Sequence, residues 1–314
     1  MPSGLLLYRP QDLLNSPTEK LLVPYVTIRC PETVYSTAWY PYSTLSDCIT
    51  FCYLSAARDH PIHLYDGLTG MLRASYPLIN HVEKFTAPYA MQFSMDGESF
   101  FAGTDSLISQ FSLNQPGPPV VSFKTSLRDY FAQKGPISAL ALSADILAAG
   151  SVSGQVGLYD PFSNSPVSVF DTIEKTGVTQ VLWSADEKLL FVASRRSDCV
   201  EIWDVRSTGC ILGKLTGRKA NTNQRMSINL KGDTLVAGGT DGQVRCWNIK
   251  SFNMQWQYQL HNDPVTGATM HPTCAILASC SGKRYFGETV DFSMEMENTL
   301  KIFDCRKDSE NALF

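Results

Sequence analysis

Short runs of basic residues are the part of this sequence best suited to chemistry, and that chemistry is the binding of anions. Arg195 and Arg196 are adjacent, and the segment KLTGRKANTNQR (214–225) contains no acidic residue. Arginine and lysine side chains hold phosphate groups through charge-assisted hydrogen bonds, and amide side chains add directed ones. The candidate binding residues are Arg58, His60, Arg195, Arg196, Arg218, Lys219, Asn223, Gln224, Arg225, Lys283 and Arg284.

The same charges could instead be ordinary solvated loop residues, because acidic residues lie among them. Asp59 follows Arg58, and Asp198 comes two residues after Arg196. The whole chain is weakly acidic, with a formal net charge of −4. A polyanion would therefore have to be attracted by a local patch rather than by the summed field of the protein.

The sequence contains no arrangement typical of an enzyme or a metal centre. The segment GSVSG (150–154) resembles a nucleophile elbow, but Val152 occupies the position of the serine. No H-E-x-x-H motif and no C-x-x-C pair is present, so the sequence indicates no zinc site. We therefore expect a protein that is not an enzyme and that holds no cofactor or metal.

The elements that must position the basic residues form a repeat. A strand-like run that ends in an aromatic residue, usually before Asp or Asn, recurs at intervals of 44 to 57 residues. The copies are LLLYR (5–9), IHLYD (62–66), ISQFS (108–112), VGLYD (156–160), VEIWD (200–204), VRCWN (244–248) and LKIFD (300–304). With three further strands in each repeat, this is the WD40 pattern, which predicts an all-β propeller of four-stranded blades.

The order of strands in such a blade, called a, b, c and d, determines where the basic residues lie. Turns between b and c, and loops from d to the next a, leave a blade at the same end. Residues 58–60, 195–196 and 283–284 fall in predicted b–c turns, and residues 214–225 form a predicted d–a loop. We therefore expect the candidate residues to gather on one face. His261, between an outer strand and the next inner strand, is expected to brace its blade through a hydrogen bond.

The chain of 314 residues is expected to form one propeller domain, residues 1–314. Residues 1–32 would contribute strands c and d of a partial first blade, which favours seven blades. The alternative is a closed ring of six blades, in which residues 21–29 would supply the outer strand of the blade formed by 265–304. The acidic segment 283–298 is predicted to be a loop insertion.

Several segments resemble one WD40 family closely. They are HPIHLYDGLTGMLRASYPLINHVEKFTAPYAMQFSMDG (60–97), PISALALSADILAAGSVSGQVGLYD (136–160), TNQR (222–225) and HPTCAILASCSGKRYF (271–286). These strings are similar to the telomerase Cajal body protein family of animals and its fungal relatives. The resemblance extends over most of the chain from about residue 33, but the longer N-terminal region of the family is absent from the sequence.

The resemblance implies a nuclear, non-enzymatic propeller that binds small nuclear, Cajal-body or telomerase RNA and helps to assemble or localise the ribonucleoprotein. In the fungal relatives the implied role shifts toward pre-mRNA splicing. The alternative is a scaffold that binds proteins in splicing complexes without touching RNA. The expected partners are a small non-coding RNA and ribonucleoprotein or spliceosomal proteins, with no membrane and a monomeric chain.

Overall fold

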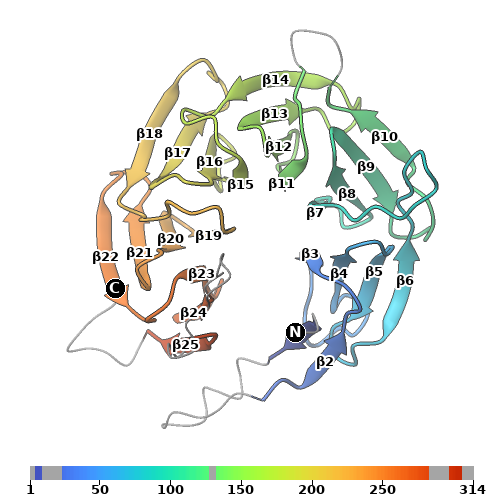
Figure 1. Cartoon of the computed structure of the whole chain (residues 1–314), viewed down its shortest axis with the longest axis horizontal. Helices are drawn as coiled ribbons and strands as arrows, with labels where there is room; N and C mark the ends of the chain where they lie inside the picture. Colours follow the sequence, from blue (N-terminus) through green and yellow to red (C-terminus); the bar gives the residue numbers. More distant parts are fainter. Residues whose placement is uncertain (1–3, 9–22, 127–131, 283–296, 306–314) are drawn as a thin grey trace, which may run out of the picture. The chain divides into compact units, whose positions relative to one another are not determined.

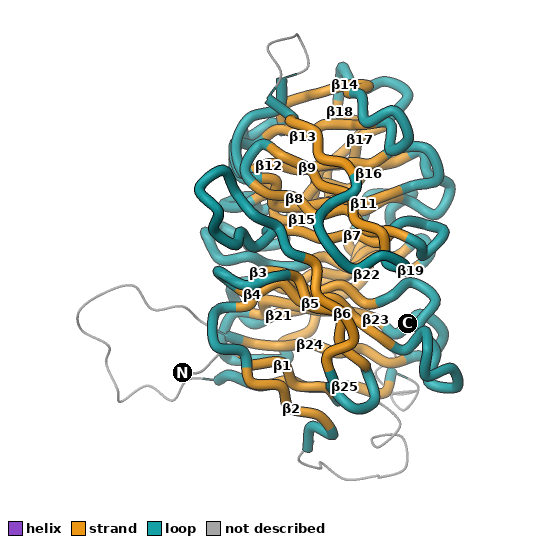
Figure 2. The backbone as a smooth tube through the Cα atoms, turned by 90° about the vertical axis from the view of Figure 1, so that its right-hand side faces the viewer, coloured by secondary structure: helices purple, strands orange, loops and turns teal. Residues whose placement is uncertain are grey.

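The regular structure of the chain consists of β-strands. The computed structural model describes residues 4–8, 23–126, 132–282 and 297–305, and all regular elements in these ranges are strands joined by turns and loops (Figure 1, Figure 2). No helix long and apolar enough to cross a membrane occurs in these ranges. The chain divides into two compact units, which are Met1–Ser151 with Gly157–Val169 and Val152–Val156 with Phe170–Phe314.

Three antiparallel sheets lie within the first unit. In the first sheet, β1 (Gly4–Leu7) pairs with β2 (Val26–Arg29). The second sheet has the order β3-β4-β5-β6 and the third the order β7-β8-β9-β10, so each follows the sequence. Their strands are β3 (Val34–Trp39), β4 (Cys52–Ala57), β5 (Ile62–Asp66), β6 (Leu72–Tyr76), β7 (Ala90–Phe93), β8 (Ser99–Thr104), β9 (Leu107–Ser112) and β10 (Val121–Lys124).

The second unit contains three further sheets, again with their strands in sequence order. They comprise β15 (Val178–Trp183), β16 (Leu189–Ser194), β17 (Cys199–Asp204) and β18 (Ile211–Thr216); β19 (Ile228–Lys231), β20 (Thr234–Gly238), β21 (Gln243–Asn248) and β22 (Met254–Gln259); and β23 (Val265–Met270), β24 (Ile276–Ser281) and β25 (Leu300–Asp304). The remaining sheet has residues in both units. It consists of β11 (Ile137–Leu142), β12 (Leu147–Ser151), β13 (Gln155–Tyr159) and β14 (Pro166–Asp171).

The described residues form six sheets of blade type, five with four strands and one with three. This count matches the six-blade alternative rather than the seven blades favoured by the sequence. The pairing assumed in that alternative is wrong, because β2 pairs with β1 and not with the strands of residues 265–304. The two strands predicted in the N-terminal segment are therefore present, as a two-stranded sheet of their own.

The predicted c strands are confirmed almost residue for residue. They correspond to β5, β9, β13, β17, β21 and β25, and their bounds differ from the predicted ones by at most one residue. Successive side chains of a strand point to opposite faces of the sheet, so the alternating pattern of these segments is the pattern of a strand. That alternation is a local signal, so the sequence alone determines these strands.

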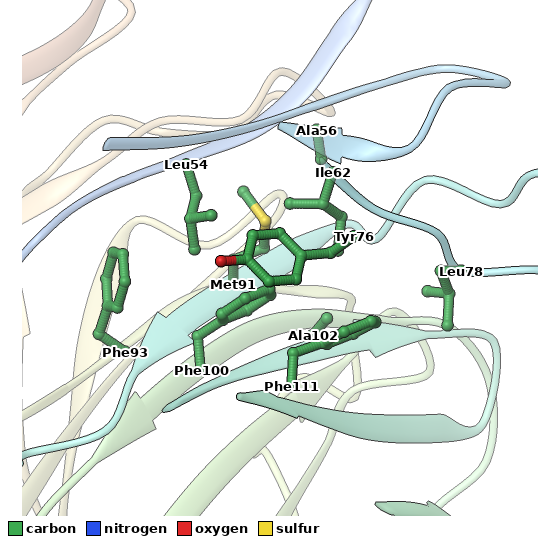
Figure 3. Packing of buried hydrophobic residues seen from close by; sticks show 10 residues of the cluster. All are labelled: Leu54, Ala56, Ile62, Tyr76, Leu78, Met91, Phe93, Phe100, Ala102 and Phe111. Atoms are coloured by element: carbon green, nitrogen blue, oxygen red, sulfur yellow. The ribbon is translucent and has the colours of Figure 1, made fainter. Parts of the chain in front are cut away.

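The core of the first unit lies where two neighbouring sheets pack face to face. Leu54 and Tyr76 of one sheet meet Phe100 and Phe111 of the next, and none of these four side chains is exposed (Figure 3). The Phe100 and Phe111 rings stack with their centroids 4.9 Å apart, and the Tyr76 ring meets the Phe100 ring edge-on. Each blade thus buries a face that a single sheet would leave in water.

A β-bulge recurs near the start of the a strands. The register shifts after Ile137, after Val178 and after Val265. In all three blades the extra residue carries a hydroxyl group that donates to a carbonyl of the b strand. The bonds are Ser138 to Gly150 O (3.4 Å), Thr179 to Ala193 O (3.1 Å) and Thr266 to Cys280 O (3.4 Å). A bulge disrupts the ladder locally, and the side chain supplies a replacement hydrogen bond.

Candidate nucleic-acid interface

The basic residues of the second unit lie on one turn and one loop that meet. The turn, residues 195–198, joins β16 to β17, and the loop, residues 217–227, joins β18 to β19. Both therefore leave their blades at the end predicted from the strand order. Arg196 and Lys219 have positive φ angles of 52°, so the backbone turns sharply at these two positions.

The turn fastens the loop through both backbone and side chain. Arg196 Nε donates to Asn223 Oδ1 (2.8 Å), and its backbone N–H donates to Thr222 O (3.0 Å). Asp198 accepts the backbone N–H of Ala220 at its carboxylate (2.6 Å) and that of Arg218 at its carbonyl (3.0 Å). Asp198 therefore fastens its turn to the loop of residues 217–227.

The Arg218 side chain does not lie at the surface, which corrects the prediction that it contacts an external anion. Only 1% of the residue is exposed, and its Nη2 atom donates to Met226 O (2.8 Å) at the far end of the same loop. Its Nε and Nη1 atoms are buried and have no hydrogen-bond partner. Burial lowers the pKa of Arg218 to about 10, so the guanidinium still carries its charge at neutral pH. Its backbone lies in the loop, as predicted, but its side chain fills the interior of that loop.

Arg195 and Arg225 bring two positive charges near each other, which suits the binding of an anion. The pKa of Arg225 is lowered by burial and then by the neighbouring positive charge of Arg195, which places the two guanidinium groups close together. Arg225 nevertheless remains accessible to solvent, so protein surrounds the group without covering it. The Nε atom of Arg195 is buried and has no hydrogen-bond partner. Two neighbouring cations are mutually repulsive, and an anion between them would relieve that repulsion.

Lys219 lies at the edge of this arrangement and forms an ion pair. Its Nζ atom is 3.3 Å from Asp241 in the turn between β20 and β21. Asp241 is held in place by a bidentate contact with the buried Arg245, at 3.0 and 2.5 Å. Because the Lys219 side chain is largely exposed, the pair leaves its ammonium group open to a second, anionic partner.

Asn223 and Gln224 position the loop, which differs from the free hydrogen-bonding role expected from the sequence. Asn223 accepts from Arg196, as described above. Gln224 Nε2 donates to Gly282 O (2.6 Å) in the turn that follows β24. The loop is thereby attached to turns of three blades. Arg225 follows directly and is oriented by these attachments.

Four further predicted residues do not belong to this arrangement as the structure describes it. Arg58 and His60 belong to the first unit, where Arg58 is 3.4 Å from Asp59 and His60 Nδ1 is 2.7 Å from Arg58 O. Lys283 and Arg284 lie outside the described residues. The structure therefore brings together Arg195, Arg196, Lys219, Asn223, Gln224 and Arg225, which we call the basic loop cluster.

His261 braces its blade, as the sequence predicted. Its ring accepts or donates at both nitrogens, with Glu297 Oε1 at 2.9 Å and Ser279 Oγ at 2.8 Å. The sequence missed Glu297, which lies at the end of the predicted insertion and also contacts Lys301 (2.8 Å). Within the described ranges, no three His, Cys, Asp or Glu side chains are grouped so that they could hold a metal ion.

Comparisons with known proteins identify the family of the chain. Residues 220–248 match the family "WD domain, G-beta repeat". Guanine nucleotide-binding protein negative regulator 1 of Schizosaccharomyces pombe is 33% identical over 280 residues, which cover 84% of this chain and 69% of that protein. Telomerase Cajal body protein 1 of Rattus norvegicus is 31% identical over 313 residues, which cover 95% of this chain and 58% of that protein. The chain belongs to the WD40-repeat family that contains these two proteins.

Membership of this family agrees with the blades that the structure shows. A crystal structure of the computationally designed Ika8 protein is similar over 88% of this chain and 72% of that one, with a TM-score of 0.60 and 19% identity. That likeness concerns the fold alone. Members of the WD40 family are typically binding scaffolds, and neither relative's name describes an enzyme. The chain spans a little over half the length of the rat telomerase Cajal body protein that it matches.

Proposed function

We propose that this protein binds a small nuclear, Cajal-body or telomerase RNA and helps to assemble or localise the ribonucleoprotein in the nucleus, without catalysing a reaction. The observation that carries the proposal is the basic loop cluster, in which the charge of Arg195 acts on Arg225 and the loop is held by three blades. Relatives named for telomerase and the Cajal body support an RNA partner and a nuclear site.

The physical argument rests on how phosphates are bound. Each phosphate neutralised by a lysine or arginine releases condensed counterions, so affinity falls as salt rises. A loop held by several hydrogen bonds loses little freedom on binding, which favours affinity. Arg196 uses Nε to hold Asn223, and its terminal nitrogens can still contact a phosphate or the edge of an unstacked base.

The proposal is tested with the double variant Arg195→Ala/Arg225→Ala. We expect it to bind a structured small nuclear or telomerase RNA of the host about tenfold more weakly than the wild type. The slope of log K against log salt concentration should become less steep by about 1.5, because two phosphate contacts are lost. Fluorescence anisotropy titrations at several salt concentrations measure both quantities.

A matched control is Lys188→Ala/Arg206→Ala, which removes two charges from turns of the second unit that lie at the opposite end of the strands. Both side chains are exposed and paired with a neighbouring aspartate. This variant should keep the wild-type affinity and salt slope. Equal losses in the two variants, or none in the first, would contradict the proposal.

The second candidate function is a protein-binding scaffold in pre-mRNA splicing complexes that touches no RNA. It is favoured by the exposed apolar side chains of residues 40–51 in the first unit. Crosslinking in cells, followed by sequencing of the attached RNA, separates the two functions. Crosslinks that map to the basic loop cluster support RNA binding, whereas co-sedimentation with splicing proteins after nuclease treatment and without crosslinked RNA supports the scaffold.

A further inference from the structure

Exposed apolar side chains gather on loops of the first unit that contact one another. Tyr42, Leu45, Ile49, Met71, Leu72 and Met95 have between 45% and 77% of their surface exposed. We call these six residues the apolar loop patch. They lie in or beside the β3–β4 loop, the β5–β6 turn and the β7–β8 loop, at the end of the strands opposite to the b–c turns. Single exposed apolar residues are ordinary, but a group on adjoining loops marks a contact surface.

Specific contacts hold these loops together. Arg73 donates from Nη1 to Ile49 O (2.6 Å) and from Nη2 to Cys48 O, and it forms an ion pair with Asp66 (2.5 Å). The Tyr42 hydroxyl donates to Met95 O, which joins the β3–β4 loop to the β7–β8 loop. A patch that is already ordered requires less loss of freedom when a partner binds.

In the second unit, the β15–β16 loop and the β17–β18 turn leave their blade at the same end and carry paired charges. The β15–β16 loop is residues 184–188, and its exposed charges are Asp186 and Lys188, which pair with each other. The β17–β18 turn holds the pair Arg206–Asp204. The β3–β4 loop is longer, residues 40–51, and a long ordered loop in a compact domain is commonly functional. The number of exposed apolar side chains on these loops is therefore not shared by every loop of this kind.

The charges around the patch indicate what would bind there. Asp47 is half-buried beside it, and Asp96 and Glu98 are exposed there. The Tyr40 side chain packs on Gly97, between the last two of these, where an added side chain would collide with its hydroxyl. None of the three carboxylates forms an ion pair with another described residue, and the nearby Arg73 is already paired with Asp66. An apolar surface edged by carboxylates that have no cationic partner is complementary to a segment that carries both apolar and basic side chains.

We propose that the apolar loop patch docks a protein segment in which aromatic or aliphatic anchors are flanked by lysine or arginine. Ile49 and Met71 contact the anchors, and Asp96 and Glu98 contact the flanking cations. This surface is separate from the basic loop cluster and is compatible with either proposed function. A protein with both surfaces joins an anionic partner at one and a basic protein segment at the other.

The test is panning of a random 12-residue peptide library on the wild-type protein, with counter-selection on the double variant Ile49→Ser/Met71→Ser. We expect enriched peptides to combine apolar residues with a net positive charge. They should bind the wild type about tenfold more tightly than the double variant, as expected for the loss of interface anchors. Asp96→Lys/Glu98→Lys should weaken the same peptides and remove the salt dependence of their binding.

The control is Leu212→Ser/Met254→Ser, which removes two exposed apolar side chains from the second unit. This variant should bind the selected peptides like the wild type, and thermal unfolding should show that all variants are folded. Enriched peptides that are neutral or acidic, or that bind the Ile49→Ser/Met71→Ser variant equally well, would overturn the proposal. A concentration-dependent dimer that this variant abolishes would also overturn it, because the patch would then join two copies of the chain.

Discussion

At the scale of single residues, the arginines of the second unit show how one residue type divides between two roles. Arg195 and Arg225 keep their charges within reach of solvent, whereas the Arg218 side chain is enclosed by its own loop. A buried guanidinium with two unpartnered nitrogen atoms carries a desolvation cost that only one hydrogen bond, to Met226 O, offsets. Arg218 therefore shapes the loop and cannot reach an external phosphate.

Arg218→Met is the variant that separates these two roles. Methionine fills a similar volume without a charge, so we expect the free energy of unfolding to change by less than about 1 kcal/mol or to rise. RNA affinity should stay within about twofold of the wild type. Urea denaturation and RNA titration measure the two quantities. A tenfold loss of RNA affinity with unchanged stability would show that the side chain makes a direct contact.

At the scale of elements, the last blade is closed by a network around Glu297. Its carboxylate accepts from Lys301, from the backbone N–H of Asn262 and from Thr299, and it contacts the His261 ring. Burial alone would raise the pKa of Glu297, but these hydrogen bonds outweigh it and hold the pKa well below the ordinary value of 4.5. The carboxylate therefore links the d–a loop at His261 to the start of β25.

The network makes stability depend on acidity. The pKa of Glu297 is lower in the folded than in the unfolded chain. The ionised carboxylate therefore stabilises the fold fully above pH 4.5, and this contribution is lost as the pH falls below that value. We expect Glu297→Gln to lower the free energy of unfolding by about 2 kcal/mol at pH 7, with a smaller difference from the wild type near pH 3.5. Urea denaturation at both pH values gives this comparison. A difference that is the same at both would contradict the assignment.

At the scale of the whole molecule, stability comes from contacts between neighbouring blades. Phe111 is fully buried in the core of the first unit, whereas Phe162 of the same unit is 83% exposed. Phe111→Ala should therefore cost about 3–5 kcal/mol of unfolding free energy, and Phe162→Ala less than about 0.5 kcal/mol. Chemical denaturation followed by tryptophan fluorescence compares the two. Similar losses would mean that burial does not decide the contribution of these rings.

The fold could be predicted from the sequence because its signals are local. The alternation around Trp203 and Trp247 identifies two c strands within one residue of their bounds. The candidate site could be predicted only in part. Which arginine is buried depends on how residues 217–227 close over Arg218, and the pairing of Gln224 with Gly282 joins positions 58 residues apart. No pattern in the sequence marks Ile49 or Met71 as exposed, because apolar residues usually predict a core.

The hydroxyl groups at three of the a-strand bulges fix the register of their blades locally. The hydroxyl groups of Ser138, Thr179 and Thr266 each donate to the neighbouring strand, so the pairing of these strands is fixed by residues that are close together in the sequence. A slip by one residue would separate the hydroxyl from its carbonyl and turn the wrong side chains inward. A blade with such a local signal keeps the register of its strands when it is duplicated, exchanged or placed at a new chain end. The loops of such blades can therefore change in sequence while the pairing of the strands stays the same.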